Sequence, residues 1–172
     1  MLKISDLNFL KIKVEKHPTT GIDLEYLKKH SAIAIFLLNY EKDKILLVNQ
    51  YRPGKQKKMY EIPAGLIDDG EDEDTAMWRE LLEETGYKKK DIELLYKNEK
   101  PLMISPGYTT ESLYFYIAKL KNSDVIPEKQ SLDKGEDLSC EWIEINMIES
   151  ITDDIKTIFS LYLYEKKVNI HD

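Results

Sequence analysis

Residues 65–87 read GLIDDGEDEDTAMWRELLEETGY, a loop rich in glycine and aspartate followed by one amphipathic stretch. The stretch predicts a helix over residues 73–84 with Gly86 at its C-cap, because glycine readily adopts the left-handed conformation that ends helices. Residues three and four apart share a helix face. One face therefore carries the carboxylates of Glu80, Glu83 and Glu84 together with Glu73 and Ala76, and the opposite, apolar face carries Met77, Trp78, Leu81 and Leu82.

The three neighbouring carboxylates need compensation, because like charges repel and raise one another's pKa unless cations neutralise them. Ligand sets made only of oxygen suit Mg²⁺, with Mn²⁺ as an alternative. A solvated acidic helix face would show the same spacing. The spacing alone therefore leaves a metal site and an ordinary acidic surface both open.

The wider pattern of this segment is more specific than its carboxylates. Eight positions stand at fixed spacing, namely Gly65, Glu71, Arg79, Glu80, Leu81, Glu83, Glu84 and Gly86. The pattern resembles the Nudix box, the loop-helix-loop signature of the Nudix hydrolases, although Tyr87 stands where the family usually has an aliphatic residue. The resemblance implies an α/β fold, a Nudix-type α/β/α sandwich with a mixed sheet, and metal-dependent hydrolysis of a pyrophosphate bond.

The resemblance also implies roles for the residues of the box. The metal ligands would be the Ala64 carbonyl and the carboxylates of Glu80, Glu83 and Glu84. Gly65 lets the backbone turn sharply and approach the metal closely. Arg79 would point off the ligand face and pair with Glu71, so that both residues support the loop structurally.

The flanks of the box carry the prediction about the substrate. Residues 48–53 (VNQYRP) and 60–68 (YEIPAGLID) resemble the ADP-ribose pyrophosphatase branch of the family. The resemblance implies that Arg52 grips a diphosphate as a bidentate donor and that Glu61 accepts hydrogen bonds from a ribose or an adenine amine. A surface cation at Arg52 and a plain strand-end acid at Glu61 remain open alternatives.

Two downstream loops extend the same resemblance. Residues 105–111 (SPGYTTE) are similar to a segment of this branch that favours sugar nucleotides, which implies substrate contacts for Tyr108 and Glu111. Extra residues in the region 88–100 place this segment further from the box than is usual. The acidic loop 132–138 corresponds to the loop that supplies a general base, which assigns this role to Glu136, with Asp133, Asp137 and the box residue Glu83 as alternatives.

The rest of the chain predicts one domain over residues 1–172. Apolar alternation in residues 9–14 and 22–27, around a turn at 17–21, predicts an N-terminal hairpin within residues 1–30. Nearly continuous apolar runs predict strands buried on both faces at residues 31–38 and 44–50. Further strands are predicted at 92–96, 111–118 and 139–145. A closing helix at 153–167 would pack through Ile155, Ile158, Phe159, Tyr162 and Leu163.

Composition limits the partners and the compartment. The chain has 172 residues, 33% of them charged, and a formal net charge of −7. This balance disfavours nucleic acid or an anionic membrane surface as a main partner. The single cysteine and the absence of a long apolar N-terminal stretch favour the cytoplasm. The resemblance adds a small nucleotide-sugar substrate and a homodimer in which the hairpin helps to shape the partner's site.

The predicted reaction converts ADP-ribose or a related ADP-sugar and water to AMP and ribose 5-phosphate. A hydrolase for GDP-mannose or another nucleotide sugar is the nearest alternative, and a non-catalytic ADP-ribose-binding regulator is a more distant one. The isopentenyl diphosphate isomerases of this fold use a catalytic cysteine, for which Cys140 is the one candidate. His17, His30 and His171 lack metal-ligand spacing and are interpreted as surface or turn residues.

Overall fold

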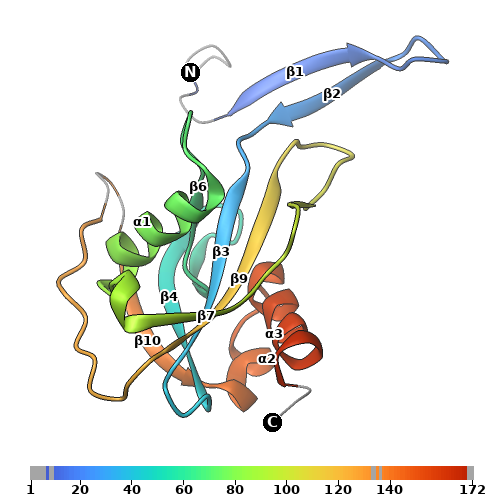
Figure 1. Cartoon of the computed structure of the whole chain (residues 1–172). Helices are drawn as coiled ribbons and strands as arrows, with labels where there is room; N and C mark the ends of the chain where they lie inside the picture. The colour runs from blue at the N-terminus through green and yellow to red at the C-terminus, as the bar shows by residue number, and fades with distance from the viewer. Residues whose placement is uncertain (1–6, 8–9, 133–134, 136, 170–172) are drawn as a thin grey trace.

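A computed structural model describes residues 7, 10–132, 135 and 137–169 (Figure 1). Five strands form the path of the central sheet, in the order β10-β4-β3-β9-β7. Their bounds are Ala32–Leu38 for β3, Lys44–Arg52 for β4, Ile92–Lys97 for β7, Ser112–Leu120 for β9 and Leu138–Glu144 for β10. Strands β3 and β9 are parallel and the other pairs along this path are antiparallel. The sheet is therefore mixed, as the sequence predicts.

Three short strands that the sequence does not predict pair with the central strands of this sheet. β5 (Lys57–Glu61) pairs with β4, and β6 (Ala64–Leu66) pairs with β3. Between them, the Pro63 carbonyl accepts a hydrogen bond of 2.8 Å from the Ile35 amide of β3. β8 (Leu102–Met103) pairs with the start of β9. The loop that leads to the carboxylate helix is thus fixed to the centre of the sheet.

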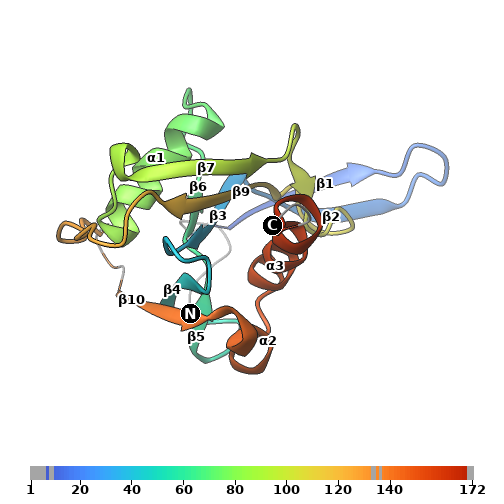
Figure 2. The same cartoon turned by 60° about the horizontal axis from the view of Figure 1, so that its bottom comes forward.

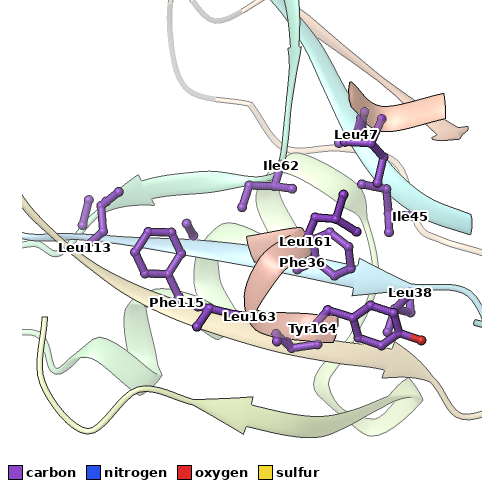
Figure 3. Close-up of a cluster of buried hydrophobic side chains, with 14 residues drawn as sticks. Phe36, Leu38, Ile45, Leu47, Ile62, Leu113, Phe115, Leu161, Leu163 and Tyr164 are labelled. Carbon is purple, nitrogen blue, oxygen red and sulfur yellow. The ribbon is translucent and has the colours of Figure 1, made fainter. Parts of the chain in front are cut away.

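Helices cover the two faces of the sheet, α1 (Glu73–Thr85) on one side and α3 (Ile155–Lys167) on the other (Figure 1). All of β3 is buried, so successive side chains fill two cores. Ile33, Ile35 and Leu37 pack with residues of α1. Phe36 instead stacks on Tyr164 of α3 at 5.6 Å between ring centroids, within the cluster of Figure 3. The architecture is the predicted α/β/α sandwich.

The hairpin also matches the prediction, with strands β1 (Lys11–Lys16) and β2 (Asp23–Lys28). It forms a separate sheet that projects away from the body of the protein (Figures 1 and 2). His17 is a turn residue, since its Nδ1 accepts hydrogen bonds from the amides of Thr19 and Thr20. The predicted strand start at residue 9 lies outside the described residues.

The carboxylate helix has defined ends. The Asp72 side chain accepts a hydrogen bond of 2.7 Å from the Thr75 amide at its N-terminus. Gly86 ends the helix with φ 76°, and its amide donates to the Leu82 carbonyl. A Cβ at Gly86 would lie 2.0 Å from the backbone oxygen of Glu128, so the position requires glycine for space as well as for conformation.

Several predicted side-chain orientations are wrong. Leu82 was expected on the apolar face of α1, but it is 39% exposed. Ala76 was expected on the carboxylate face, but it is fully buried, because α1 packs against both β3 and β6 and so buries a wide face. On α3, Ile155 and Tyr162 were expected in the core and are exposed. Thr157, Ser160, Leu161 and Tyr164 are buried there together with the predicted Leu163.

Short helical segments complete the chain, η2 (Lys89–Asp91) before β7, and η3 (Ile145–Met147) with α2 (Ile148–Ile151) between β10 and α3. Within the described part of the chain, no helix is long and apolar enough to cross a membrane.

Candidate active site

The carboxylate face of α1 lies against the loop before it. Glu84 is only 4% exposed, and its Oε2 accepts a hydrogen bond of 3.0 Å from the Ala64 amide. Glu80 approaches the backbone of Gly65 so closely that a Cβ at this position would lie 1.8 Å from the Glu80 Cδ. Gly65 therefore makes room for the carboxylate of Glu80.

Arg79 lies among these carboxylates, although it was expected to point off their face. Its guanidinium donates to both Glu71 oxygens, at 3.0 and 2.9 Å, and to the Leu66 carbonyl at 2.9 Å. It also donates to Glu80 at 2.7 Å and to Glu83 at 3.2 Å. The hydrogen bonds with Arg79 lower the pKa of Glu71, and those with Glu71 raise the pKa of Arg79. Arg79 both holds the loop to the helix and partly neutralises the acidic face.

The donor chemistry of this face fits a hard divalent cation, because the ligands offered are oxygens and Gly65 allows close approach. As the side chains stand, no group of three or more histidine, cysteine, aspartate or glutamate side chains among the described residues is arranged to hold an ion. Arg79 bridges Glu80 and Glu83, so a metal there would have to replace contacts of the guanidinium. The metal ligands of the sequence analysis remain a prediction.

A cavity of about 480 Å³ opens beside this face. It is lined by side chains from the box, from β3, β4 and β9, from α3 and from the segment after the hairpin. The lining residues are Lys29, Ala32, Arg52, Ala64, Gly65, Leu66, Asp68, Arg79, Glu80, Glu111, Leu113 and Lys156. Four of the twelve are cationic, which suits an anionic ligand.

Two of these cations share a buried carboxylate. Glu61 is 1% exposed and accepts hydrogen bonds from Arg52 at 2.6 and 2.9 Å and from Lys156 at 2.9 Å. Burial alone would raise the pKa of Glu61, but Arg52 and Lys156 lower it below its ordinary value. Both oxygens of Glu61 are thus engaged within the protein, which favours an anchoring role over the predicted contact with a ribose or adenine.

Lys156 is positioned by the N-terminus of α3. Its ammonium also donates to Asp154 at 2.6 Å, and Asp154 caps the helix by accepting from the Thr157 amide at 3.0 Å. The Thr157 hydroxyl accepts in turn from the Ile62 amide at 2.9 Å. Burial alone would lower the pKa of Lys156, but Asp154 and Glu61 raise it above its ordinary value. Lys156 therefore keeps its charge although it is largely buried.

The loop 105–111 contributes one of its two predicted contacts to the cavity. Glu111 lines the cavity and forms an ion pair of 3.3 Å with Lys29. Tyr108 is 57% exposed and does not belong to the described lining. Its predicted role in stacking on a base has no support from this geometry.

The predicted base Glu136 and its alternative Asp133 lie outside the described residues. Asp137 is described, and its side chain is 88% exposed and 3.3 Å from Lys58. Glu83 is more central, since Arg79 contacts it on the carboxylate face.

Cys140 has the character of a structural cysteine. Its thiol donates to the Glu84 carbonyl at 3.2 Å, and burial raises its pKa to about 11. A thiol with such a pKa is almost entirely protonated at neutral pH and is a poor nucleophile. Of the histidines, His30 lies 3.6 Å from exposed Asp69, and His171 is outside the described residues.

Lys29 and Lys156 line the cavity although the sequence does not predict a role for either. Lys156 lies within the predicted closing helix, but its contact with Glu61 spans 95 positions, so no local pattern marks it. The only local signal is that it follows Asp154, a residue type favoured at a helix N-cap. Lys29 follows the hairpin without any motif.

The cavity thus combines carboxylates of the box with fixed cations, a lining that suits a phosphate-containing ligand. The sequence profile of the NUDIX domain family matches residues 28–162. The chain therefore belongs to the Nudix family, and it is a Nudix pyrophosphohydrolase.

Several relatives are similar over most of the chain. A methanol dehydrogenase activator of Bacillus methanolicus is 31% identical, covering 84% of this chain and 68% of the relative. An ADP-ribose pyrophosphatase of Bacillus subtilis is also 31% identical, covering 83% and 70%. A GDP-mannose pyrophosphatase of Salmonella choleraesuis is 34% identical, covering 70% and 62%. A crystal structure of an ADP compounds hydrolase covers 93% of this chain and 94% of its own, with 21% identity and a TM-score of 0.66, and shows the same fold.

Proposed function

We propose that this protein hydrolyses the pyrophosphate bond of ADP-ribose or a related ADP-sugar, giving AMP and ribose 5-phosphate. The observation that carries the proposal is one cavity lined both by Arg52 and Lys156, which buried Glu61 fixes, and by Glu80 and Gly65 of the box. Fixed cations facing a carboxylate helix suit a diphosphate bridged by a metal. The similarity to ADP-ribose pyrophosphatases supports the choice of substrate.

In this proposal, Arg52 and Lys156 bind the diphosphate and set its orientation. Glu61 holds both cations in place before substrate arrives, so little side-chain entropy is lost on binding. Arg79 and Glu71 keep the loop that carries Ala64 and Gly65 against α1.

Nudix hydrolases generally use divalent metal ions. We propose Mg²⁺, with Mn²⁺ as an alternative, held by the Ala64 carbonyl and the carboxylates of Glu80, Glu83 and Glu84. When bound, such an ion offsets charge on the phosphates and lowers the pKa of a water molecule.

The base in this proposal is Glu136 or, failing that, Glu83. The base takes one proton from the attacking water while the water oxygen bonds to phosphorus and the bridging P–O bond breaks. The departing phosphate oxygen keeps the bonding electrons. In Glu136→Gln, a lower maximal rate at an unchanged Mg²⁺ midpoint would support Glu136, whereas a rate near that of the wild type would transfer the role to Glu83 or a neighbouring loop acid.

The direct test is a screen of the purified protein against ADP-ribose, ADP-glucose, GDP-mannose and ATP, with Mg²⁺ and chromatographic detection of products. We expect the highest kcat/KM for ADP-ribose and the products AMP and ribose 5-phosphate. The alternative substrate GDP-mannose has its own support in the similarity to GDP-mannose pyrophosphatases. A kcat/KM at least about tenfold higher for GDP-mannose would transfer the assignment, since tenfold corresponds to a difference of about 1.4 kcal/mol in transition-state binding.

Two further alternatives have less support. A non-catalytic regulator would not need the intact set of box carboxylates. An isomerase would need a reactive thiol, and Cys140 has a raised pKa and bonds to the backbone instead.

We also propose that the protein is a homodimer in which the hairpin packs against a second copy. The hairpin exposes Ile12, Val14, Ile22 and Leu24 on a two-stranded sheet, and such a sheet is rarely stable in isolation. Light scattering coupled to size-exclusion chromatography tests this. A monomeric mass at micromolar concentration would contradict it.

A further inference from the structure

The end of hairpin strand β2 is joined to the loop 105–111 by a parallel bridge between Leu27 and Thr109. The Leu27 amide donates to the Tyr108 carbonyl at 2.7 Å, and the Thr110 amide donates to the Leu27 carbonyl at 3.0 Å. The Thr110 hydroxyl accepts from the Lys29 amide and donates to the Lys29 carbonyl, both at 2.8 Å. Four hydrogen bonds thus fix residues 27–29 to residues 108–110.

This bridge leads directly into the cavity. Lys29 ends the first bridged segment, and Glu111 directly follows the second. Their side chains line the cavity and form an ion pair of 3.3 Å. Both side chains are about one-third exposed. A partly exposed ion pair contributes little to folding stability, so its position in the cavity is better explained by the ligand than by the fold.

We infer that Lys29 is a positioning residue that holds the Glu111 carboxylate at the cavity wall, so that Glu111 accepts a hydrogen bond from a sugar hydroxyl of the substrate. This inference rests on the proposed function, because it needs a substrate with a sugar arm. Lys29 engages Oε1 of Glu111, and the carboxylate has further lone pairs that can accept from a hydroxyl.

Lys29 has a second effect in this arrangement, because it compensates the charge of Glu111. A carboxylate without a cation beside it would repel an anionic diphosphate. Removal of the Lys29 ammonium therefore harms binding through Glu111. The loss of affinity should therefore depend on the charge of Glu111, whereas direct binding of phosphate by Lys29 would not depend on it.

The experiment compares steady-state kinetics with ADP-ribose for the wild type, Lys29→Met, Glu111→Gln and the double variant. Lys29→Met should raise KM by roughly tenfold with kcat within about twofold, because the contact serves ground state and transition state alike. Adding Glu111→Gln should restore KM to within roughly threefold of the wild type, because the uncompensated charge is gone. Lys29→Arg should retain most of the affinity.

Lys28→Met is the matched control, since Lys28 is the exposed neighbour on the hairpin strand, and it should leave KM unchanged. A double variant that binds no better than Lys29→Met would mean that the loss of Lys29 does not act through the charge of Glu111, and the inference would be wrong. Unchanged KM in Lys29→Met would also overturn it. If the wild type hydrolyses none of the nucleotide sugars, the proposed function fails, and this inference fails with it.

Discussion

The two charged regions of the site are built as opposites. In the first region, Arg79 of α1 binds three carboxylates, those of Glu71, Glu80 and Glu83. In the second region, buried Glu61 binds both Arg52 and Lys156, and Asp154 also binds Lys156. Each region carries counterions that neutralise its charge in part. The difference is that a metal must compete with Arg79 for its ligands, whereas a diphosphate can approach cations that Glu61 already holds in place.

The two regions also differ in how the chain assembles them. Glu80, Glu83 and Glu84 come from five consecutive positions of one helix. The cations come from β4, from α3 and from the segment after the hairpin, and only the sheet brings them together. Substitution of a glutamate on α1 should therefore weaken metal binding and catalysis. Substitution of Arg52 or Glu61 should instead affect substrate affinity and stability.

The largest effect should follow removal of a charge from the helix. Glu84→Gln replaces a buried carboxylate whose Oε2 contacts the Ala64 amide with a neutral group of the same shape. Loss of a metal ligand should lower activity on the order of 10²-fold or more and raise the Mg²⁺ concentration at half-maximal rate. Initial rates measured against Mg²⁺ test this.

Excess chelator should abolish turnover of the wild-type enzyme. Full activity in chelator, or a Mg²⁺ midpoint of Glu84→Gln equal to that of the wild type, would contradict a metal role for this helix. Glu165→Gln is a matched control, because Glu165 is an exposed glutamate on the other helix.

A smaller effect should follow removal of a cation from the other side. Arg52→Ala should raise KM for ADP-ribose by roughly tenfold with a smaller change in kcat, because the guanidinium grips the diphosphate before and during the reaction. The Mg²⁺ midpoint should stay near that of the wild type. A fall in kcat with unchanged KM would instead assign Arg52 to the transition state.

The contrast between the regions also explains what could be predicted from the sequence. The helix bounds, the Gly86 cap and the carboxylates follow from spacing within one segment. β5 and β6 were missed because they are short and have no clear periodicity. Lys156 and Lys29 were missed because their partners lie 95 and 82 positions away. Arg79 was misplaced because its long side chain reaches across the helix surface to both neighbouring glutamates.

The last effect concerns stability instead of kinetics and tests whether Glu61 is an anchor. The folded-state pKa of Glu61 is lowered by Arg52 and Lys156, so its ionised form stabilises the fold above its ordinary pKa of 4.5. That contribution disappears as the pH falls through the folded-state pKa. Glu61→Gln should lower the free energy of unfolding by about 2 kcal/mol at pH 7, because it leaves two partly buried cations without a charged partner.

Urea unfolding of the wild type and Glu61→Gln between pH 7 and pH 3 measures this contribution. The difference in the free energy of unfolding between the two proteins should shrink as the pH falls below about 4.5, because the unfolded wild type then takes up a proton at Glu61 and the folded carboxylate follows at lower pH. Glu165→Gln, which changes an exposed glutamate, should follow the wild type throughout. A difference that stays constant across this range would mean that the charge of Glu61 does not stabilise the fold. The anchoring role would then be wrong, and the contact with a ribose or an adenine amine that the sequence predicts for Glu61 would be the alternative.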